Sequence, residues 1–321
     1  MTVFVETPAR LHFGVLDLRG SLGRWFGGIG AAAPGPTLRL SATTSPTLEV
    51  AGENVERVAD FARRFETHFA LDRSGTSVRL HVERALPEHA GLGSGTQLAL
   101  AVARAMAEVH GITAGPAELA CAMGRGRRSG IGTWTFAGGG FVVEGGHARE
   151  KPAVAPLIAR VPFPASWRCV VAVPRPARSI SGEAEAAAFA GLPPPPEADV
   201  ERVSHLVLMG MLPALADGDI ASFGAALTAV QTITGRWWAP AQGGTFASGE
   251  SEELVRRMSE WGAAGVGQSS WGPAVYGIVD GEDAGRRLAD RARQAVAAGG
   301  SVHEGPFPAG GARVIISGDA S

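Results

Sequence analysis

A glycine-rich segment that runs directly into an apolar stretch is the feature that most constrains the fold of this chain. Residues 87–97 read PEHAGLGSGTQ, and residues 98–109 are mostly apolar. Apolar and polar side chains alternate over residues 77–83, which predicts a half-buried strand. The order is therefore strand, glycine loop, helix. Such a loop points unpaired backbone N–H groups at the positive end of the helix dipole, and this arrangement favours a phosphate or a diphosphate.

The loop itself supplies the first set of candidate ligands. Its glycines let the backbone approach an anion closely, and its hydroxyls can cap the helix, contact phosphate or hold a magnesium ion. We assign phosphate or pyrophosphate binding to Gly91, Leu92, Gly93, Ser94, Gly95 and Thr96. The segment lacks the Lys-Ser or Lys-Thr of a P-loop and the glycine spacing of a dinucleotide-binding turn. A ligand-free glycine turn with a Ser/Thr cap is the structural alternative.

Three further segments combine small residues with groups that bind anions. Arginine suits phosphate and carboxylate because its planar fork makes two parallel hydrogen bonds. Residues 124–132 hold three arginines among four glycines, and residues 265–273 hold two hydroxyls in a second small-residue loop. The candidate residues are Arg10, His12, Asp17, Arg24, Gly27 and Gly28 near the N-terminus, Arg125, Arg127, Arg128 and Ser129 in the centre, and Ser269 and Ser270 near the C-terminus. Solvated surface arginines and an ordinary β-turn are the alternatives.

Composition excludes several classes of function. The chain has 321 residues, 45% of them apolar, and its 29 basic and 31 acidic residues give a net charge near −2. This balance does not indicate a nucleic-acid surface. No apolar run reaches membrane-spanning length. We expect Cys121 and Cys169 to be buried thiols in a reducing compartment. A cytoplasmic protein with small-molecule substrates, and neither nucleic acid nor membrane as partner, is the prediction.

The remaining periodicity predicts two α+β halves. Strands are expected at 2–5, 37–44, 46–50, 77–83, 141–143, 169–173, 273–279, 300–304 and 312–317, and helices at 54–69, 97–110, 113–123, 198–216, 219–232, 250–262 and 282–298. A proline-rich stretch at 152–166 predicts a boundary between domains at 1–160 and 161–321. We interpret Trp237-Trp238 as a core or interface pair, with stacking on an aromatic ligand as the alternative.

Taken together, these segments resemble the GHMP superfamily, named for galactokinase and for homoserine, mevalonate and phosphomevalonate kinases. Residues 87–97 match its phosphate loop, Pro-x-x-x-Gly-Leu-Gly-Ser-Ser, with Gly95 in place of the second Ser. Residues 264–277 occupy the place of its C-terminal glycine motif. The resemblance covers nearly the whole chain. It implies an α+β, GHMP-kinase-like two-domain fold with a ribosomal-protein-like first domain and a ferredoxin-like second domain.

Within that superfamily the chain is similar to the β-ribofuranosylaminobenzene 5′-phosphate synthases. The similarity is carried by residues 10–18, 23–30, 125–132, 139–143 and 269–273. It implies an enzyme, a decarboxylating pentosyltransferase of tetrahydromethanopterin biosynthesis. Such an enzyme couples 4-aminobenzoate or 4-hydroxybenzoate to phosphoribosyl pyrophosphate with magnesium, and it releases carbon dioxide and pyrophosphate. The resemblance also suggests a homodimer.

The roles that follow are hypotheses. The loop cradles pyrophosphate, and Arg24 with the Arg125–Arg128 group binds the 5′-phosphate or the benzoate carboxylate. Arg10, His12 and Asp17 line the reacting centre, with Asp17 and Thr96 as candidate Mg²⁺ ligands. Gly27, Gly28, Ser129, Ser269 and Ser270 contribute to substrate binding.

The competing prediction is an ATP-dependent small-molecule kinase of the same superfamily. Many of those kinases place an Asp after Ser-Gly-x as general base, whereas this chain has Gly132 and Thr133 there. A catalytically silent binding module on the same fold is the third possibility.

Overall fold

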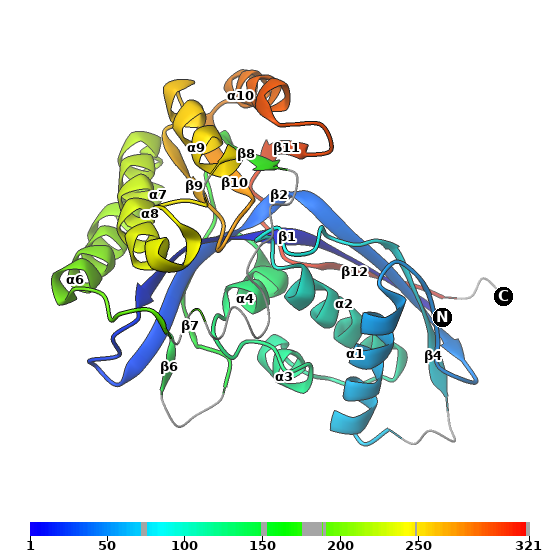
Figure 1. Cartoon of the computed structure of the whole chain (residues 1–321). Helices are drawn as coiled ribbons and strands as arrows, with labels where there is room; N and C mark the ends of the chain where they lie inside the picture. The colour runs from blue at the N-terminus through cyan, green and yellow to red at the C-terminus, as the bar shows by residue number, and fades with distance from the viewer. Residues whose placement is uncertain (72–75, 149–152, 175–187, 189–190, 248, 319–321) are drawn as a thin grey trace.

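The molecule is built around two long antiparallel strands, β1 (Thr2–Asp17) and β2 (Arg24–Ser45). Figure 1 shows them running from the end where both termini lie to the helices of the second half. The computed structural model describes residues 1–71, 76–148, 153–174, 188, 191–247 and 249–318. Because the two strands extend under both halves of the chain, they can present residues to each half.

The first sheet has the strand order β12-β1-β2-β4-β3, and three short strands extend it beside β2. The added strands are β3 (Glu49–Gly52), β4 (Ser77–Arg84), β5 (Phe141–Glu144), β6 (His147–Ala148), β7 (Leu157–Val161) and β12 (Arg313–Ser317). β12 comes from the end of the chain and pairs with β1, so the sheet of the first half includes a strand of the second. The division at residue 160 stays a prediction.

Four helices lie on one face of this sheet (Figure 1). They are α1 (Val55–His68), α2 (Ser94–Val109), α3 (Pro116–Ala122) and α4 (Ile131–Gly138). α2 is the central one, and its residues from Gln97 to Ala103 are all buried. A helical segment that is buried on every side is held in place by the core around it. The N-terminus of α2 is therefore fixed relative to β1 and β2.

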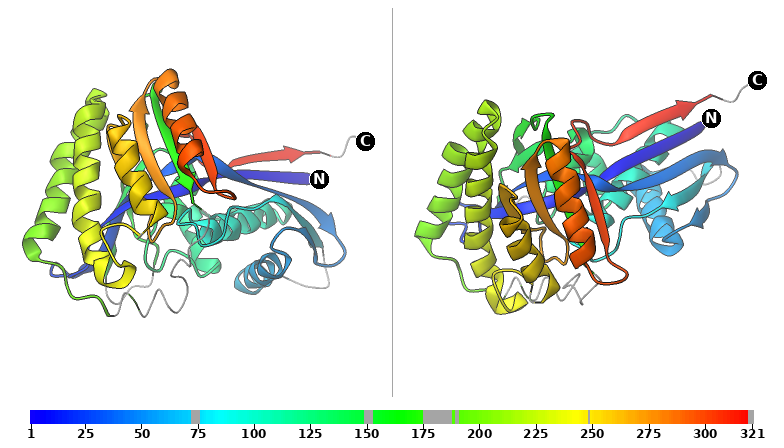
Figure 2. Two further views of the ribbon diagram at one scale, coloured as in Figure 1. Left: turned by 45° about the horizontal axis from the view of Figure 1, so that its top comes forward. Right: turned by 90° about the horizontal axis from the view of Figure 1, so that it is seen from above.

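The second sheet has the order β11-β8-β10-β9, with every neighbouring pair antiparallel. Its strands are β8 (Trp167–Val173), β9 (Gly265–Gln268), β10 (Val275–Asp280) and β11 (Ser301–Pro306). α9 (Glu250–Glu260) and α10 (Glu282–Ala295) lie side by side over this sheet (Figure 2). The long helix α8 (Ile220–Gln242) packs against β9, beside a continuous helical segment made of α6 (Glu197–His205), the π-helical stretch η1 (Leu206–Met211) and α7 (Leu212–Asp217).

The predicted α+β architecture is confirmed, and the main errors fall where the chain is rich in glycine. Residues 24–35 belong to β2, although no strand was predicted between residues 6 and 36. Residues 131–138 form the helix α4, which was not predicted. β1 continues past residue 5 to Asp17, and its residues 11–15 are all buried. Because both faces of that stretch are covered, the alternation that marks a half-buried strand is absent.

Smaller corrections concern single sites. α2 begins at Ser94 and not at residue 97, with Gly93 at the N-cap and no side-chain cap. The hydroxyls of Ser94 and Thr96 therefore do not cap the helix. Cys169 is buried as expected, but Cys121 is exposed on α3. Within the described part of the chain, no helix combines the length and apolar content that crossing a membrane requires.

Candidate active site

A basic pocket forms where the glycine loop meets the arginine-rich segment. Its lining consists of the glycine loop (Gly91, Gly93 to Thr96), residues 124–129 with Gly132, the turn Ser270 to Gly272, and the side chains of Arg10, Arg57 and His89. The lining includes five arginines and no carboxylate. Two helices, α2 and α4, begin at this pocket, so their positive dipole ends add to the side-chain charge. The pocket is therefore built for an anion with several charged oxygens.

The glycine loop turns its carbonyl groups inward. Gly91 O accepts hydrogen bonds from Arg10 Nη1 at 2.5 Å and from Ser269 Oγ at 2.6 Å. Leu92 O accepts one from the backbone N–H of Arg10 at 3.0 Å, while the Leu92 side chain is buried in the core. No hydrogen bond among the described residues is donated by the N–H of Gly93, Ser94 or Gly95. These N–H groups are thus available for a ligand at the start of α2.

Two arginines lie over the first turn of α2. A Cβ atom at Gly95 would come 3.0 Å from Arg57 Nη2 and 3.4 Å from Arg125 Nη1. The Arg125 guanidinium also lies over the ring of Phe61, 5.1 Å from its centroid. Burial, followed by the charges of Arg57 and Arg64, lowers the pKa of Arg125. Crowded cations of this kind are stabilised by an anion. The glycine at position 95 leaves room for both guanidinium groups.

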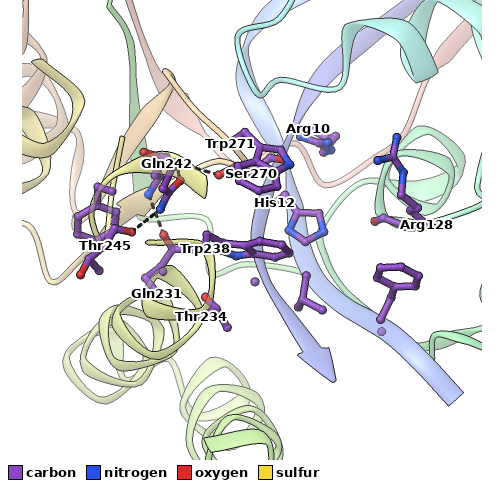
Figure 3. A pocket seen from close by; sticks show the side chains of 18 residues that line it. Arg10, His12, Arg128, Gln231, Thr234, Trp238, Gln242, Thr245, Ser270 and Trp271 are labelled. Atoms are coloured by element: carbon purple, nitrogen blue, oxygen red, sulfur yellow. Dashed lines mark hydrogen bonds between the residues drawn. The ribbon is translucent and has the colours of Figure 1, made fainter. Parts of the chain in front are cut away.

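A second, mostly uncharged pocket adjoins the basic one. We call it the aromatic pocket; it is lined by His12, Gly14, Val15, Phe26, Gly27, Gln231, Thr234, Gly235, Trp238, Gln242, Thr245, Phe246 and Gln268, together with five residues that it shares with the basic pocket. The rings of Trp238 and Trp271 lie 4.9 Å apart between centroids. Figure 3 shows these two rings and the His12 imidazole between the arginines and the glutamines. Flat aromatic walls of this kind suit an aromatic ligand.

The two pockets share one wall. Arg10, Arg128, Ser129, Ser270 and Trp271 line both. Three of the five non-glycine residues with positive φ among the described residues also line these pockets: Phe26, His89 and Ser270, with φ of 68°, 54° and 56°. Backbone strain of this kind concentrates at functional sites. Both observations place the candidate site at the junction of the pockets.

The turn after β9 holds the glycine loop and β1 together. The buried Ser269 hydroxyl donates to Gly91 O and accepts the backbone N–H of His12 at 2.9 Å. The N–H of Ala274 donates to Ala90 O at 3.1 Å. The second half of the chain therefore fixes the position of the phosphate loop. Ser269 therefore positions the glycine loop and β1 without lining either pocket, whereas the neighbouring Ser270 lines both pockets.

A buried acid and a buried base lie beside the aromatic pocket. A Cβ at Gly28 would come 3.2 Å from Glu144 Oε1 and 3.5 Å from His12 Nε2, so both groups face the same point. Burial raises the pKa of Glu144 to about 7, against the hydrogen bonds from Gly146 and Gly130. Burial and the charge of Arg10 lower the pKa of His12 to about 3. His12 is therefore a neutral imidazole in the pocket wall near neutral pH.

This pair predicts a stability maximum in mildly acidic solution. The pKa of Glu144 is raised in the folded protein. Its contribution to folding stability is therefore complete below about pH 4.5 and is lost as the pH rises through about 7. The pKa of His12 is lowered in the folded protein. Its contribution to folding stability is therefore complete above about pH 6.5 and is lost as the pH falls towards 3. Glu144→Gln should remove the alkaline loss. Between about pH 5 and about pH 8.5, the wild type should lose roughly 2–3 kcal/mol of unfolding free energy relative to this variant. Urea unfolding at both pH values measures the difference, and parallel pH profiles for the two proteins would contradict it.

Two of the four residues predicted to be catalytic, Asp17 and Arg24, lie outside both pockets, and of the predicted binding residues Gly28, Leu92 and Ser269 line neither. Asp17 lies at the end of β1, where its Oδ1 accepts the backbone N–H of Arg19 at 2.6 Å and of Gly20 at 2.9 Å. Arg24 is exposed and donates to the carbonyls of Gly145 and Gly146 at 2.6 and 2.7 Å. Neither lines the basic or the aromatic pocket. Their catalytic roles stay predictions.

The candidate magnesium ligands Asp17 and Thr96 do not lie in one site. Thr96 lines the basic pocket and Asp17 does not. Among the described residues, no group of three or more His, Cys, Asp and Glu side chains could hold a metal ion. The protein oxygens that the basic pocket offers are hydroxyl and backbone oxygens, which are poor partners for Mg²⁺ without a carboxylate or a phosphate. The residues that the structure describes therefore do not form a magnesium site of their own.

Several pocket residues were not predicted from the sequence. On α8, four pocket residues lie on one side of the helix, at spacings of three, four and four residues: Gln231, Thr234, Trp238 and Gln242. That spacing was the available signal. Of the tryptophan pair, Trp237 is a core residue as expected, but Trp238 lines the aromatic pocket. For Arg57 and Glu144 no local pattern distinguishes them from other charged residues.

Comparisons with known proteins agree with this geometry. Residues 54–139 match the family model "GHMP kinases N terminal domain", and residues 211–298 match "GHMP kinases C terminal". The beta-ribofuranosylphenol 5'-phosphate synthase of Methanothermobacter thermautotrophicus is 38% identical over 306 residues, covering 87% of this chain and 89% of the relative. The chain belongs to the beta-ribofuranosylphenol 5'-phosphate synthase family. The synthase of the same name from Archaeoglobus fulgidus is 37% identical over 294 residues, covering 86% of this chain and 87% of that protein.

Solved structures place this synthase family in a wider fold group. Phosphomevalonate kinase from Streptococcus pneumoniae superposes with a TM-score of 0.69 at 11% identity, covering 96% of this chain and 100% of the kinase. Mevalonate pyrophosphate decarboxylase from Streptococcus pyogenes gives 0.69 at 14% identity, covering 96% and 98%. At such identities the likeness concerns the fold alone. Together with the two family models, it confirms the predicted GHMP-type two-part α+β architecture of this chain.

Proposed function

We propose that the protein joins 4-hydroxybenzoate or 4-aminobenzoate to phosphoribosyl pyrophosphate with loss of carbon dioxide and pyrophosphate, as a step of tetrahydromethanopterin biosynthesis. Membership of the synthase family makes the chain a pentosyl-transferring enzyme and does not favour a kinase. The observation that carries the proposal is the wall that the basic and aromatic pockets share. An enzyme that joins a polyanionic sugar to an aromatic acid needs both environments in direct contact.

The basic pocket suits the anionic groups of phosphoribosyl pyrophosphate. The unpaired N–H groups of Gly93, Ser94 and Gly95 can bind a diphosphate at the start of α2. Arg57 and Arg125 lie directly over this turn and can neutralise the charge that grows as the diphosphate leaves. We assign Arg127 and Arg128, from the same lining, to the second phosphate of the sugar.

The aromatic pocket suits the benzoate. Its ring fits against the Trp238 and Trp271 side chains, and its carboxylate is directed to the shared wall, where Arg10 and Arg128 lie (Figure 3). The ring carbon that bears the carboxylate then faces the sugar. Bond formation requires the two reacting carbons to approach to roughly 3–3.5 Å. The shared wall is where this approach occurs.

The chemistry balances without an external acid or base. The bond from ribose C1 to the diphosphate oxygen breaks, and the diphosphate takes the electron pair. A bond forms between ribose C1 and the ring carbon bearing the carboxylate. The bond from that carbon to the carboxylate then breaks, carbon dioxide leaves, and the electron pair restores aromaticity. The neutral His12 and the apolar walls serve to keep water from the cationic sugar carbon.

The choice between the two benzoates follows from the names of the relatives. They are named as synthases of a ribofuranosylphenol phosphate, and replacing the carboxylate of 4-hydroxybenzoate by ribose leaves a phenol. We therefore propose 4-hydroxybenzoate as the preferred acceptor. Magnesium would arrive bound to the diphosphate, since the lining of the basic pocket adds hydroxyl oxygens and no carboxylate. A cytoplasmic location and a homodimer belong to the same proposal.

The lack of room for a side chain at Gly132 distinguishes this site from that of a kinase with an aspartate as general base. A Cβ at Gly132 would come 2.9 Å from Thr96 Cγ2 and 3.3 Å from Thr96 Cβ. An aspartate there would force the Thr96 side chain, in the first turn of α2, to shift. The position that serves many superfamily kinases as a general base is thus filled by a neighbouring side chain, which supports carbon–carbon bond formation over phosphate transfer to a hydroxyl.

The assay uses 4-hydroxybenzoate labelled in its carboxyl carbon. With phosphoribosyl pyrophosphate and Mg²⁺, the enzyme should release labelled carbon dioxide and pyrophosphate in equal amounts. With ATP in place of the sugar diphosphate, no label should be released. Phosphate transfer from ATP to a small-molecule hydroxyl, without carbon dioxide from the first mixture, would overturn the proposal in favour of a kinase.

A further inference from the structure

We infer that the end of the aromatic pocket farthest from the arginines recognises the para substituent of the aromatic acid as a hydrogen-bond donor, and that the Thr234 hydroxyl determines this specificity. The inference rests on the proposed function for the orientation of the ring. It goes further because it assigns a recognition role to α8 of the second half and states which substituents the enzyme accepts.

The two ends of the pocket differ in charge. Figure 3 shows Arg10 and Arg128 on one side of the Trp238 and His12 rings, and Gln231, Gln242, Thr234 and Thr245 on the other. The lining of the aromatic pocket contains no carboxylate and no lysine. A para-substituted benzoate has a charged group at one end of a flat ring and a neutral polar group at the other. With its carboxylate at the arginines, its para group reaches the amides and hydroxyls.

The polar end has already used most of its donors. Thr234 Oγ1 donates to Val230 O at 2.9 Å, so this oxygen can only accept a further hydrogen bond. Gln242 Nε2 donates to Gly244 O at 3.0 Å and to Thr245 O at 2.8 Å. Both N–H groups of the Gln242 amide are therefore engaged, and only its oxygen lone pairs remain for a ligand.

Gln268 completes this set of acceptors. Its Nε2 donates to Gln242 Oε1 at 3.2 Å and to Ser270 O at 2.9 Å. Gln231 Nε2 donates to Phe13 O at 2.5 Å and keeps a second N–H, so it is the exception. These bonds tie α8 to β1 and β9, which holds the polar end rigid. Apart from the second N–H of Gln231 and the Thr245 hydroxyl, the groups at this end can only accept, and a rigid end of this kind favours a ligand that brings its own hydrogen.

Thr234 is the member of this end that can be changed without loosening the fold. A Cβ at Gly14 would come 3.6 Å from Thr234 Oγ1, so the oxygen faces the part of β1 that lines the pocket. The hydroxyl makes one bond, within its own helix. Valine has the same branched shape and lacks only the oxygen. A phenol or an aniline can donate to this oxygen, whereas a fluorine or a methoxy group cannot.

The test compares 4-hydroxybenzoate with 4-fluorobenzoate, which has a similar size and no donor. Calorimetry measures the binding of each acid to the wild type, Thr234→Val and Thr234→Ser. The wild type should bind 4-hydroxybenzoate about tenfold more tightly than 4-fluorobenzoate, the expected effect of one neutral hydrogen bond. Thr234→Val should lose most of this preference, and Thr234→Ser should keep it.

Steady-state kinetics supply the second readout. Thr234→Val should raise the KM for 4-hydroxybenzoate five- to tenfold and leave the KM for phosphoribosyl pyrophosphate unchanged, since the basic pocket is untouched. A variant that was merely destabilised would change both constants. In the wild type, 4-methoxybenzoate should be a poor substrate, although its substituent activates the ring as well as a hydroxyl does.

The outcomes separate the two proposals. The inference is overturned if Thr234→Val retains the full preference for 4-hydroxybenzoate, or if the wild type shows no such preference. The proposed decarboxylating transfer is then still decided by the assay with carboxyl-labelled 4-hydroxybenzoate. If the preference depends on Thr234 but no carbon dioxide is released with phosphoribosyl pyrophosphate, the inference holds and the proposed reaction is wrong.

Discussion

Gly91→Ala should lower kcat/KM about a thousandfold, the largest effect that we expect from one methyl group in this protein. A Cβ at Gly91 would come 2.2 Å from Ser269 O and 3.1 Å from Gly272 O, both of them backbone atoms. Backbone atoms cannot rotate aside, so the loop or the turn after β9 must shift by about an ångström. Such a shift separates the amides that bind the diphosphate from the wall that binds the benzoate.

Gly111→Ala is the matched control for this substitution. Gly91 and Gly111 have similar positive φ values, 75° and 65°, so alanine brings similar backbone strain at both. Nothing lies within 4 Å of a Cβ at Gly111. The control should therefore lose about 1 kcal/mol of stability and keep its activity. Circular dichroism shows whether both variants are folded at the assay temperature. Equal activity of the two folded variants would contradict the role of the contact between Gly91 and Ser269.

Arg10→Met should lower kcat/KM between a hundred- and a thousandfold. The Arg10 side chain lies in the wall that both pockets share, and it holds Gly91 O at 2.5 Å. Its removal takes away a cation at the point where the benzoate carboxylate and the leaving diphosphate come closest. It also loosens the glycine loop, because the charged hydrogen bond to Gly91 O is lost.

Arg104→Met controls for the loss of one positive charge. Arg104 lies on α2 and pairs with Glu108, one turn along the same helix and outside both pockets. This variant should keep kcat/KM within a factor of about two, because a surface pair of this kind contributes little. Initial rates over a range of both substrates separate the effects on kcat and on each KM. An Arg10 variant with normal kinetics would remove this residue from the site.

The parts of the site that are local in sequence could be predicted. The glycine loop and the start of α2 lie within one segment, so their order and their free N–H groups follow from glycine spacing and helix geometry. Arg125, Arg127 and Arg128 were predicted for the same reason and do line the basic pocket. The strand alternation before the loop also predicted β4 to within one residue.

The parts that depend on long-range packing could not be predicted. Arg57 reaches the pocket from α1, and its position over Gly95 depends on how α1 packs against α2. Glu144 becomes a buried acid only because β5 pairs with the glycine-rich part of β2, where Gly28 lies opposite it and leaves no side chain in the way. The acceptors on α8 face the pocket because α8 packs against β9 and β1. The contacts of Arg57 and Glu144 leave no pattern within their own segments, and on α8 the three- and four-residue spacing of the pocket residues is the one local signal.

A crystal structure of the enzyme with pyrophosphate and 4-hydroxybenzoate tests the central claim most directly. The account predicts pyrophosphate against the N–H groups of Gly93 to Gly95, and the benzoate ring beside Trp238 and Trp271 with its carboxylate at the shared wall. Pyrophosphate bound away from the glycine loop, or a benzoate outside the aromatic pocket, would contradict it.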